Sequence, residues 1–223
     1  MNSPLFSIII PTYNRGTLIK KAIDSVLSQK FDDFELIIID DGSNDDTKKI
    51  ISKYTDSRVK YIYQDNAERS AARNNGIKNA MGIFICFLDS DDQYKKNHLA
   101  VFYEAIKSND YKKCMFFSKI LTTNQIENKY NDYEKILKYM IHPQEVCIHK
   151  SIFDYEKFDI NLNIGEDFDL WIRIIHKFPL FHINKNTVLI NSHDGRSIDI
   201  KKNNVYKINL KTFKKIYSDK KYK

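Results

Sequence analysis

The chain has 223 residues, which fits one ordinary domain with a short appendage and excludes a large multidomain assembly. Hydrophobic residues make up 42% and aromatic residues 13% of the sequence, enough for a packed core, so an intrinsically disordered chain is excluded. No run approaches the roughly 18 to 20 apolar residues that a membrane-spanning helix needs. The first residues lack the charged and apolar regions of a signal peptide, so we expect a cytoplasmic protein.

The net charge of +7 belongs to the C-terminal tail. Residues 201–223 contain nine lysines and one acidic residue, whereas the other 200 residues contain 27 basic and 28 acidic groups. Apolar side chains recur in this tail at three- and four-residue steps, which predicts a basic amphipathic helix suited to an anionic membrane surface. The alternative is that this helix packs on the main domain and that its lysines reflect codon bias. Nucleic-acid binding is not expected, because the remainder is slightly acidic and carries no nucleic-acid motif.

Strand and helix patterns alternate through the first 110 residues. In chain order, the spacing of apolar residues predicts strands and helices at 6–10, 18–27, 36–39, 47–54, 59–63, 67–80, 83–88 and 97–107, beginning with a strand. The strand at 36–39 is continuously apolar, which is typical of a sheet covered on both faces. Such strand–helix repetition predicts an α/β fold, with a mostly parallel central sheet and helices on both of its faces.

The pattern loosens after about residue 110. Strands are predicted at 114–121 and 146–149, a helix at 166–176, and two short strands around Ile183 and at 187–190. The three cysteines, Cys86, Cys114 and Cys147, have no metal-ligand or redox spacing, so we expect them to be reduced and structural.

Polar clusters follow three of the predicted strands, at 12–14, 40–41 and 89–92. Ligands of parallel sheets bind beyond the carboxyl ends of the strands, so we expect these clusters to line one cleft. Asp89, Asp91 and Asp92 repel one another unless a cation neutralises them, and Mg²⁺ or Mn²⁺ bridged to a diphosphate is the usual solution. A solvated acidic turn is the alternative for that cluster, and a turn with a helix N-cap is the alternative at 40–41.

Five segments in the right order resemble the family 2 glycosyltransferases, an inverting family with the GT-A fold. They are Ser7–Arg15, Ile37–Thr47, Ala71–Gly76, Phe87–Asp92 and Gly165–Arg173. The sequence departs from the family where Asn66 is followed by Ala67-Glu68-Arg69-Ser70, because relatives usually have small residues there, often with glycine. We expect the charged side chains of this departure to lie near the donor sugar.

The resemblance implies a role for particular residues. Those that would bind a nucleotide-sugar donor are Pro11, Thr12, Tyr13, Asn14, Asp40, Asp41, Arg73 and Asp89. Asp91 and His193 would hold Mn²⁺ or Mg²⁺, although His193 also fits an ordinary surface loop. Asp167 would be the catalytic base, and Glu166 would bind the acceptor or orient the loop. Trp171 is a further acceptor candidate through sugar stacking, although its helical spacing favours a core position.

The resemblance therefore implies a metal-dependent inverting glycosyltransferase, transferring a hexosyl or N-acetylhexosaminyl group. Its donor would be a UDP-sugar and its acceptor a carbohydrate or lipid-linked glycan, in bacterial cell-surface polysaccharide or lipopolysaccharide synthesis. The domain would cover residues 1–200, with a nucleotide-sugar-binding half at 1–110 and an acceptor-side half at 111–200, before the tail at 201–223. Two alternatives are an inactive glycosyltransferase-like binding module and a phosphoacceptor signalling domain. The Glu166-Asp167 pair does not fit the second.

Overall fold

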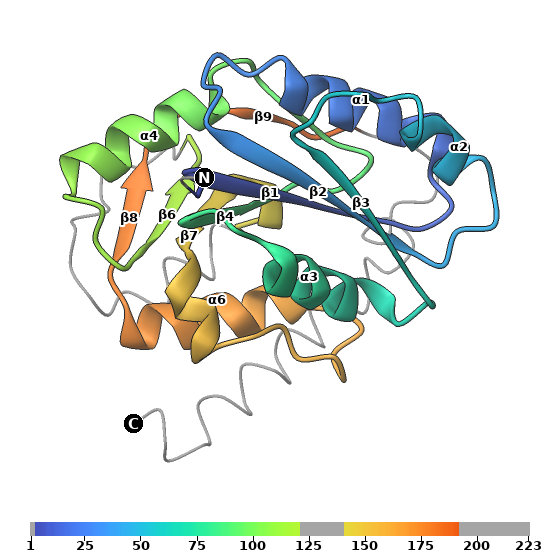
Figure 1. Cartoon of the computed structure of the whole chain (residues 1–223). Coiled ribbons are helices and arrows are strands. Elements are labelled where there is room, and N and C mark those ends of the chain that lie inside the picture. Colours follow the sequence, from blue (N-terminus) through green and yellow to red (C-terminus); the bar gives the residue numbers. More distant parts are fainter. Residues whose placement is uncertain (1–2, 121–140, 192–223) are drawn as a thin grey trace.

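The computed structural model describes residues 3–120 and 141–191 of the chain (Figure 1). Its elements are β1 (Phe6–Thr12), α1 (Gly16–Leu27), β2 (Phe34–Asp41), α2 (Thr47–Ile51), β3 (Val59–Gln64), α3 (Glu68–Asn79), β4 (Phe84–Phe87), β5 (Gln93–Tyr94), α4 (His98–Ser108), β6 (Met115–Ser118), η1 (Pro143–Glu145), β7 (Val146–His149), η2 (Lys150–Asp154), α6 (Glu166–Lys177), β8 (Leu180–Ile183) and β9 (Val188–Leu189). The predicted basic C-terminal helix lies outside the described residues.

One seven-stranded sheet forms the centre of the molecule, in the order β3-β2-β1-β4-β7-β6-β8. All pairs are parallel except the two made by β7, which runs antiparallel between β4 and β6. A second sheet contains only β5 and β9. The predicted mostly parallel α/β architecture is therefore confirmed.

Helices cover both faces of the central sheet (Figure 1). Side chains of β1 alternate between the faces, so that Ile8 and Ile10 join the core under α1 and α4, whereas Ile9 joins the core under α3 and α6. Helix α3 lies close to β1 at Gly76, where a Cβ atom would come 2.4 Å from Ile9 Cγ2. This close approach brings the side chains of α3 to the carboxyl edge of the sheet.

The strand register brings the predicted polar clusters to one edge. Thr12 lies opposite Asp40 across β1 and β2, and the backbone N–H of Leu88, just beyond β4, donates to Ile9 O at 3.0 Å. The three cysteines are buried free thiols, with Cys86 opposite Cys147, as expected. Among the helices of the described residues, none has the length and apolar character needed to cross a bilayer.

Candidate active-site cleft

A cleft of about 220 Å³ opens beyond the carboxyl ends of β1, β2 and β4. Thirteen residues line it: Pro11, Thr12, Tyr13, Arg15, Asp41, Asn66, Glu68, Arg69, Ala72, Arg73, Asp89, Ser90 and Asp91. All three predicted polar clusters therefore contribute to one cleft, as the parallel sheet requires. The charged pair that departs from the family pattern, Glu68 and Arg69, also lines it.

Asp41 lines this cleft and is held by hydrogen bonds. Its Oδ1 accepts hydrogen bonds from Gln64 Nε2 at 2.6 Å and from Ala67 N at 2.9 Å, while Asn66 donates to its carbonyl. Thr12 is 3% exposed, and its hydroxyl oxygen has no hydrogen-bond partner in the described structure.

Two predicted donor residues stabilise a turn instead of lining the cleft. Asp40 is fully buried, where it accepts hydrogen bonds from Ser43 N at 2.9 Å and from the hydroxyl of Tyr61 at 2.7 Å. Asn14 is exposed, with a φ of 50°, and its side chain accepts from Asn44 N at 2.9 Å. The turn interpretation therefore holds for Asp40, and the donor contacts of Asp40 and Asn14 stay predictions.

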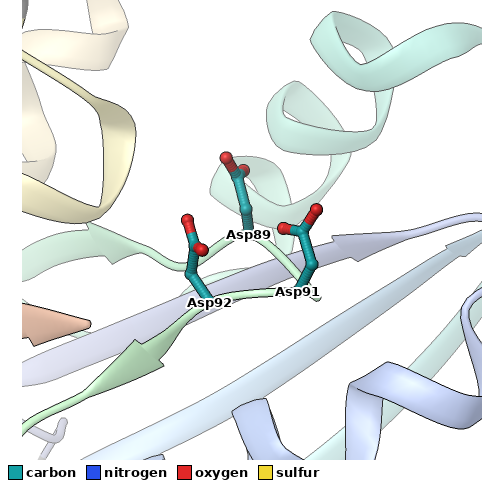
Figure 2. A group of neighbouring side chains, drawn as sticks. All are labelled: Asp89, Asp91 and Asp92. Atoms are coloured by element: carbon teal, nitrogen blue, oxygen red, sulfur yellow. The ribbon is translucent and has the colours of Figure 1, made fainter. Parts of the chain in front are cut away.

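Three aspartates lie together at the end of β4 (Figure 2). One carboxylate oxygen of each lies within 4.8 Å of the others. Asp89 and Asp91 line the cleft, whereas Asp92 is fully buried. A set of carboxylates alone suits hard cations such as Mg²⁺ and Mn²⁺, so the donor atoms fit the expected metal. His193, the other predicted ligand, lies outside the described residues.

Arg73 connects this cluster to the acidic pair that begins α6. Its guanidinium is 3% exposed and donates from Nη2 to Asp89 Oδ1 and from Nη1 to Glu166 Oε1, both at 2.9 Å. Burial opposes the charge, but the neighbouring carboxylates outweigh it and hold the pKa of Arg73 above its usual value. Arg73 lines the cleft, and its two terminal nitrogens are engaged by carboxylates.

Glu166 and Asp167 have different surroundings although they are adjacent. Glu166 is 4% exposed, is absent from the cleft lining and is ion-paired with Arg73, which favours the orienting role over the acceptor contact. Asp167 is partly exposed and accepts from Phe168 N at 2.8 Å. Burial and the negative charge of Glu166 raise the pKa of Asp167 to about 7, although Arg73 lowers it.

Trp171 belongs to the core. It is 1% exposed, its Nε1 donates to Ile141 O at 3.1 Å, and its ring lies against the rings of Phe87 and Phe158. Because so little of the ring is exposed, a sugar cannot stack on it. The acceptor-binding prediction is wrong and the core interpretation is confirmed.

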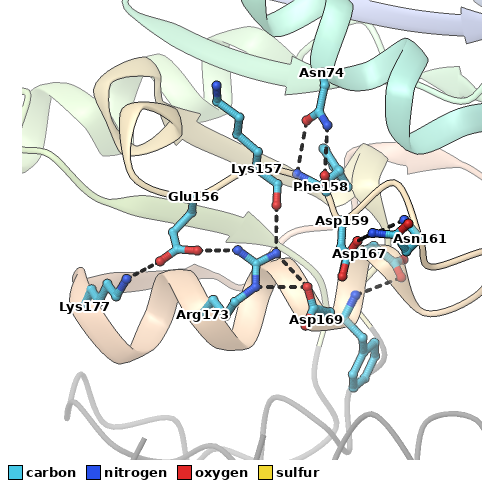
Figure 3. A network of polar contacts seen from close by, with 11 residues as sticks. Asn74, Glu156, Lys157, Phe158, Asp159, Asn161, Asp167, Asp169, Arg173 and Lys177 are labelled. Atoms are coloured by element: carbon cyan, nitrogen blue, oxygen red, sulfur yellow. Dashed lines mark hydrogen bonds and ion pairs between the residues drawn. The ribbon is translucent and has the colours of Figure 1, made fainter. Parts of the chain in front are cut away.

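A loop between η2 and α6 contributes contacts that sequence reasoning missed (Figure 3). Asn74 of α3 accepts from Phe158 N at 3.1 Å and donates to Phe158 O at 2.8 Å. On the other side of the loop, Arg173 of α6 is ion-paired with Glu156 and Asp169. The loop is thereby held between α3 and α6. Asn74 follows Arg73 in a recognised segment, but nothing local to it indicates a partner 84 residues away.

Comparisons with known proteins agree with this geometry. A family model described as glycosyl transferase family 2 matches residues 7–203. An uncharacterized glycosyltransferase of Rickettsia conorii is 33% identical over 230 residues, covering 96% of this chain and 37% of the relative. The Escherichia coli chondroitin synthase is 30% identical over 229 residues, covering 92% and 32%. The chain thus spans about a third of the length of these relatives.

A third relative is closer in length. The Escherichia coli protein WfgD, named as a UDP-Glc:alpha-D-GlcNAc-diphosphoundecaprenol beta-1,3-glucosyltransferase, is 32% identical over 191 residues, covering 82% of this chain and 75% of its own.

Solved structures share the fold at lower sequence identity. Residues 1–349 of TarS from S. aureus, in complex with UDP-GlcNAc, give a TM-score of 0.77 at 21% identity, over 95% of this chain and 66% of that one. The mannosyltransferase PcManGT from Pyrobaculum calidifontis, in complex with GDP-Man and Mn²⁺, gives 0.67 at 16% identity, over 86% and 59%. These matches confirm the predicted GT-A fold.

Proposed function

The chain belongs to glycosyl transferase family 2, and on this premise we propose that it transfers a sugar, with inversion, from a UDP-sugar to a carbohydrate or lipid-linked glycan. One observation supports this most. Arg73 joins Asp89, which lines the cleft, to Glu166, the neighbour of a carboxyl group whose pKa is near 7. A donor site and a proton acceptor are thereby held on either side of one guanidinium.

The nucleoside would lie at the β1–β2 side of the cleft. There Pro11, Thr12 and Tyr13 line the wall, and the fixed carboxylate of Asp41 suits the N–H of a uracil base. Tyr13 is 48% exposed, so its ring is available to a base or ribose. The names of two similar proteins, one with UDP-Glc and one with UDP-GlcNAc, favour uracil as the base.

Asp91 and Asp89 would hold a Mn²⁺ or Mg²⁺ ion, with His193 as a further ligand from the segment beyond residue 191. When bound, the cation stabilises the negative charge that the departing nucleoside diphosphate acquires. Arg73 keeps Asp89 in place, and both carboxylates line the cleft in which the donor would lie.

Asp167 would act as the catalytic base. An acceptor hydroxyl is a poor nucleophile, and a carboxylate within hydrogen-bond reach activates it by taking its proton during attack. A pKa near 7 suits this work, because a large fraction of the group is ionised at neutral pH and the carboxylate is basic enough to accept a proton. Attack from the face opposite the diphosphate inverts the anomeric centre, so one carboxylate suffices.

The acceptor would come from cell-surface polysaccharide or lipopolysaccharide synthesis, in line with the names of chondroitin synthase and WfgD. The basic tail at 201–223 would bring the enzyme to the anionic cytoplasmic face of a membrane, where lipid-linked acceptors lie. The donor half at 1–110 and the acceptor half at 111–200 would meet at Arg73, whose ion pairs join the two.

A panel of UDP-, GDP- and dTDP-sugars tests the proposal. Each is added with Mn²⁺, and both thermal stabilisation and release of the nucleoside diphosphate are measured. We expect a UDP-sugar to stabilise the chain and to be turned over slowly by water in the absence of an acceptor. Stabilisation by GDP- or dTDP-sugars alone would refute the uracil assignment.

A further inference from the structure

We propose that Asp92 is a positioning residue, which holds the backbone of Asp91 in place, and that it is not a cation ligand. The three aspartates look equivalent in the sequence, but only Asp92 is both fully buried and absent from the cleft lining. The proposal deepens the proposed function, on which it rests, because it assigns separate work to members of one acidic cluster.

Both carboxylate oxygens of Asp92 are engaged by distant parts of the chain. Oδ2 accepts from Gln144 Nε2 at 2.7 Å, and Oδ1 accepts from the backbone N–H of Asn191 at 2.9 Å. These partners lie 52 and 99 residues away in the sequence. Asp92 therefore connects the turn after β4 to the helix η1 and to the segment after β9. We call these two hydrogen bonds the Asp92 junction.

Asn191 links Asp92 to the backbone of Asp91. Its Nδ2 donates to Asp91 O at 2.6 Å, while its own N–H is held by Asp92. The adjoining strands β5 and β9 pair at Gln93 and Leu189, which fixes the same segment from its other end. The backbone of Asp91 is thus held by Asn191, a residue from a distant segment of the chain.

The three side chains of this turn lie close together but in different surroundings. The backbone N–H of Asp92 donates to Asp89 O at 3.0 Å, closing a tight turn after β4. Asp89 and Asp91 line the cleft and Asp92 lies in the protein interior. Figure 2 shows the three carboxylates rising from this one turn.

Gln144 supports the same interpretation. It is fully buried, and its Oε1 has no hydrogen-bond partner in the described part of the chain. The ionised carboxylate of Asp92 can only accept, so the amide of Gln144 is oriented with its NH₂ toward Asp92. The pair therefore has a fixed polarity, with Gln144 as donor and Asp92 as acceptor.

The direction of this hydrogen bond can be reversed by exchanging the carboxylate at position 92 with the amide at position 144. In Asp92→Asn alone, the new amide keeps the N–H of Asn191 on its oxygen, and its NH₂ either faces the NH₂ of Gln144 or, if that amide rotates, leaves the Gln144 NH₂ without an acceptor. In Gln144→Glu alone, two carboxylates face each other. In the double variant, the amide introduced at position 92 donates to the carboxylate introduced at position 144 and still accepts from the N–H of Asn191, so both of these hydrogen bonds are restored and the net charge is unchanged.

The measurements are the metal-free thermal midpoint and the affinity for UDP with and without Mn²⁺, by calorimetry. We expect each single variant to lower the midpoint and to weaken Mn²⁺-dependent UDP binding about fivefold or more, and the double variant to restore both to within about twofold. Asp91→Asn is the matched control, which should lose the Mn²⁺-dependent affinity without losing the metal-free midpoint.

Three results would overturn the proposal. The double variant could regain its midpoint yet bind UDP with Mn²⁺ as weakly as Asp91→Asn, which would make Asp92 a ligand. It could fail to regain the midpoint, or Gln144→Glu could match the wild type, and either result would show that the hydrogen bond between Asp92 and Gln144 does not stabilise the turn. Absence of Mn²⁺-dependent UDP binding in the wild type would instead refute the proposed function, and the metal-free midpoints would still decide on the junction.

Discussion

Replacing Asp167 with asparagine should lower the rate of turnover and raise the thermal midpoint at pH 8. The amide keeps the shape of the side chain and can still accept the hydrogen bond from Phe168 N, but it cannot take a proton from the acceptor. Loss of a general base costs on the order of 10²–10⁴ in kcat, or about 3–5 kcal/mol. Because Asp167 does not belong to the lining of the donor cleft, UDP affinity should be nearly unchanged.

The stability effect follows from the raised pKa. The folded protein keeps the proton of Asp167 up to about pH 7, whereas an unfolded aspartate loses it near a pH of about 3.9. The folded state is therefore destabilised progressively as the pH rises from about 4 to 7, and the penalty is complete above pH 7 and absent below pH 4. Its size is on the order of 2–4 kcal/mol at pH 8. The amide variant avoids it, so its thermal midpoint should exceed that of the wild type at pH 8 and match it at pH 4.

Thermal melts from pH 4 to 8, together with single-turnover transfer and calorimetry with UDP and Mn²⁺, test both parts. Asp169→Asn is the matched control on the same helix, because Asp169 is ion-paired with Arg173 at 2.6 Å. That variant should be less stable at neutral pH and should show no gain that grows with pH. A midpoint difference for Asp167→Asn that does not change with pH, or a loss of UDP affinity without a specific loss of turnover, would refute the reasoning.

Four further predictions concern the cleft, the loop and the tail. Asp91→Ala should abolish turnover and Mn²⁺-dependent UDP binding together, because the diphosphate then lacks its bridging cation; retained Mn²⁺-dependent affinity in calorimetry would contradict the metal assignment. Asn74→Ala should lower the free energy of unfolding by about 1–3 kcal/mol, because it leaves the backbone N–H and C=O of Phe158 unpaired. Urea titration measures this change. Asn79→Ala is the control that should change little, because the amide of Asn79 bonds within the same helix, to Asn75. Glu68→Gly should raise stability by about 1 kcal/mol, because Glu68 has a φ of 68°, and a lower urea midpoint would show that its side chain outweighs the strain. The full chain should co-sediment with anionic vesicles at low salt more than a version ending at Ile200, and equal sedimentation would rule out a membrane role for the tail.

Local spacing determined much of this protein from sequence alone. Apolar runs and helical periodicity depend on neighbours within a few residues, and they predicted the central strands and the helices α1, α3, α4 and α6. Because parallel strands end at a common edge, the clusters at 12–14, 40–41 and 89–92 could be assigned to one cleft before any contact was known. Helical spacing also placed Trp171 in the core, as its burial confirms.

Only the tertiary structure decided which carboxylates face the cleft and which hold the fold. Asp40 and Asp41 are adjacent, as are Asp91 and Asp92, yet each pair divides between a buried bond network and the cleft. Adjacent residues at the end of a strand differ in burial because the partners that bury one of them come from far along the chain, as Asn191 does for Asp92. Arg73 likewise meets Glu166 from 93 residues away, because the close contact of α3 with β1 and the position of α6 bring them together. Such partners leave no periodic signal in the sequence, since each is one bond between segments whose approach is set by the packing of the whole sheet.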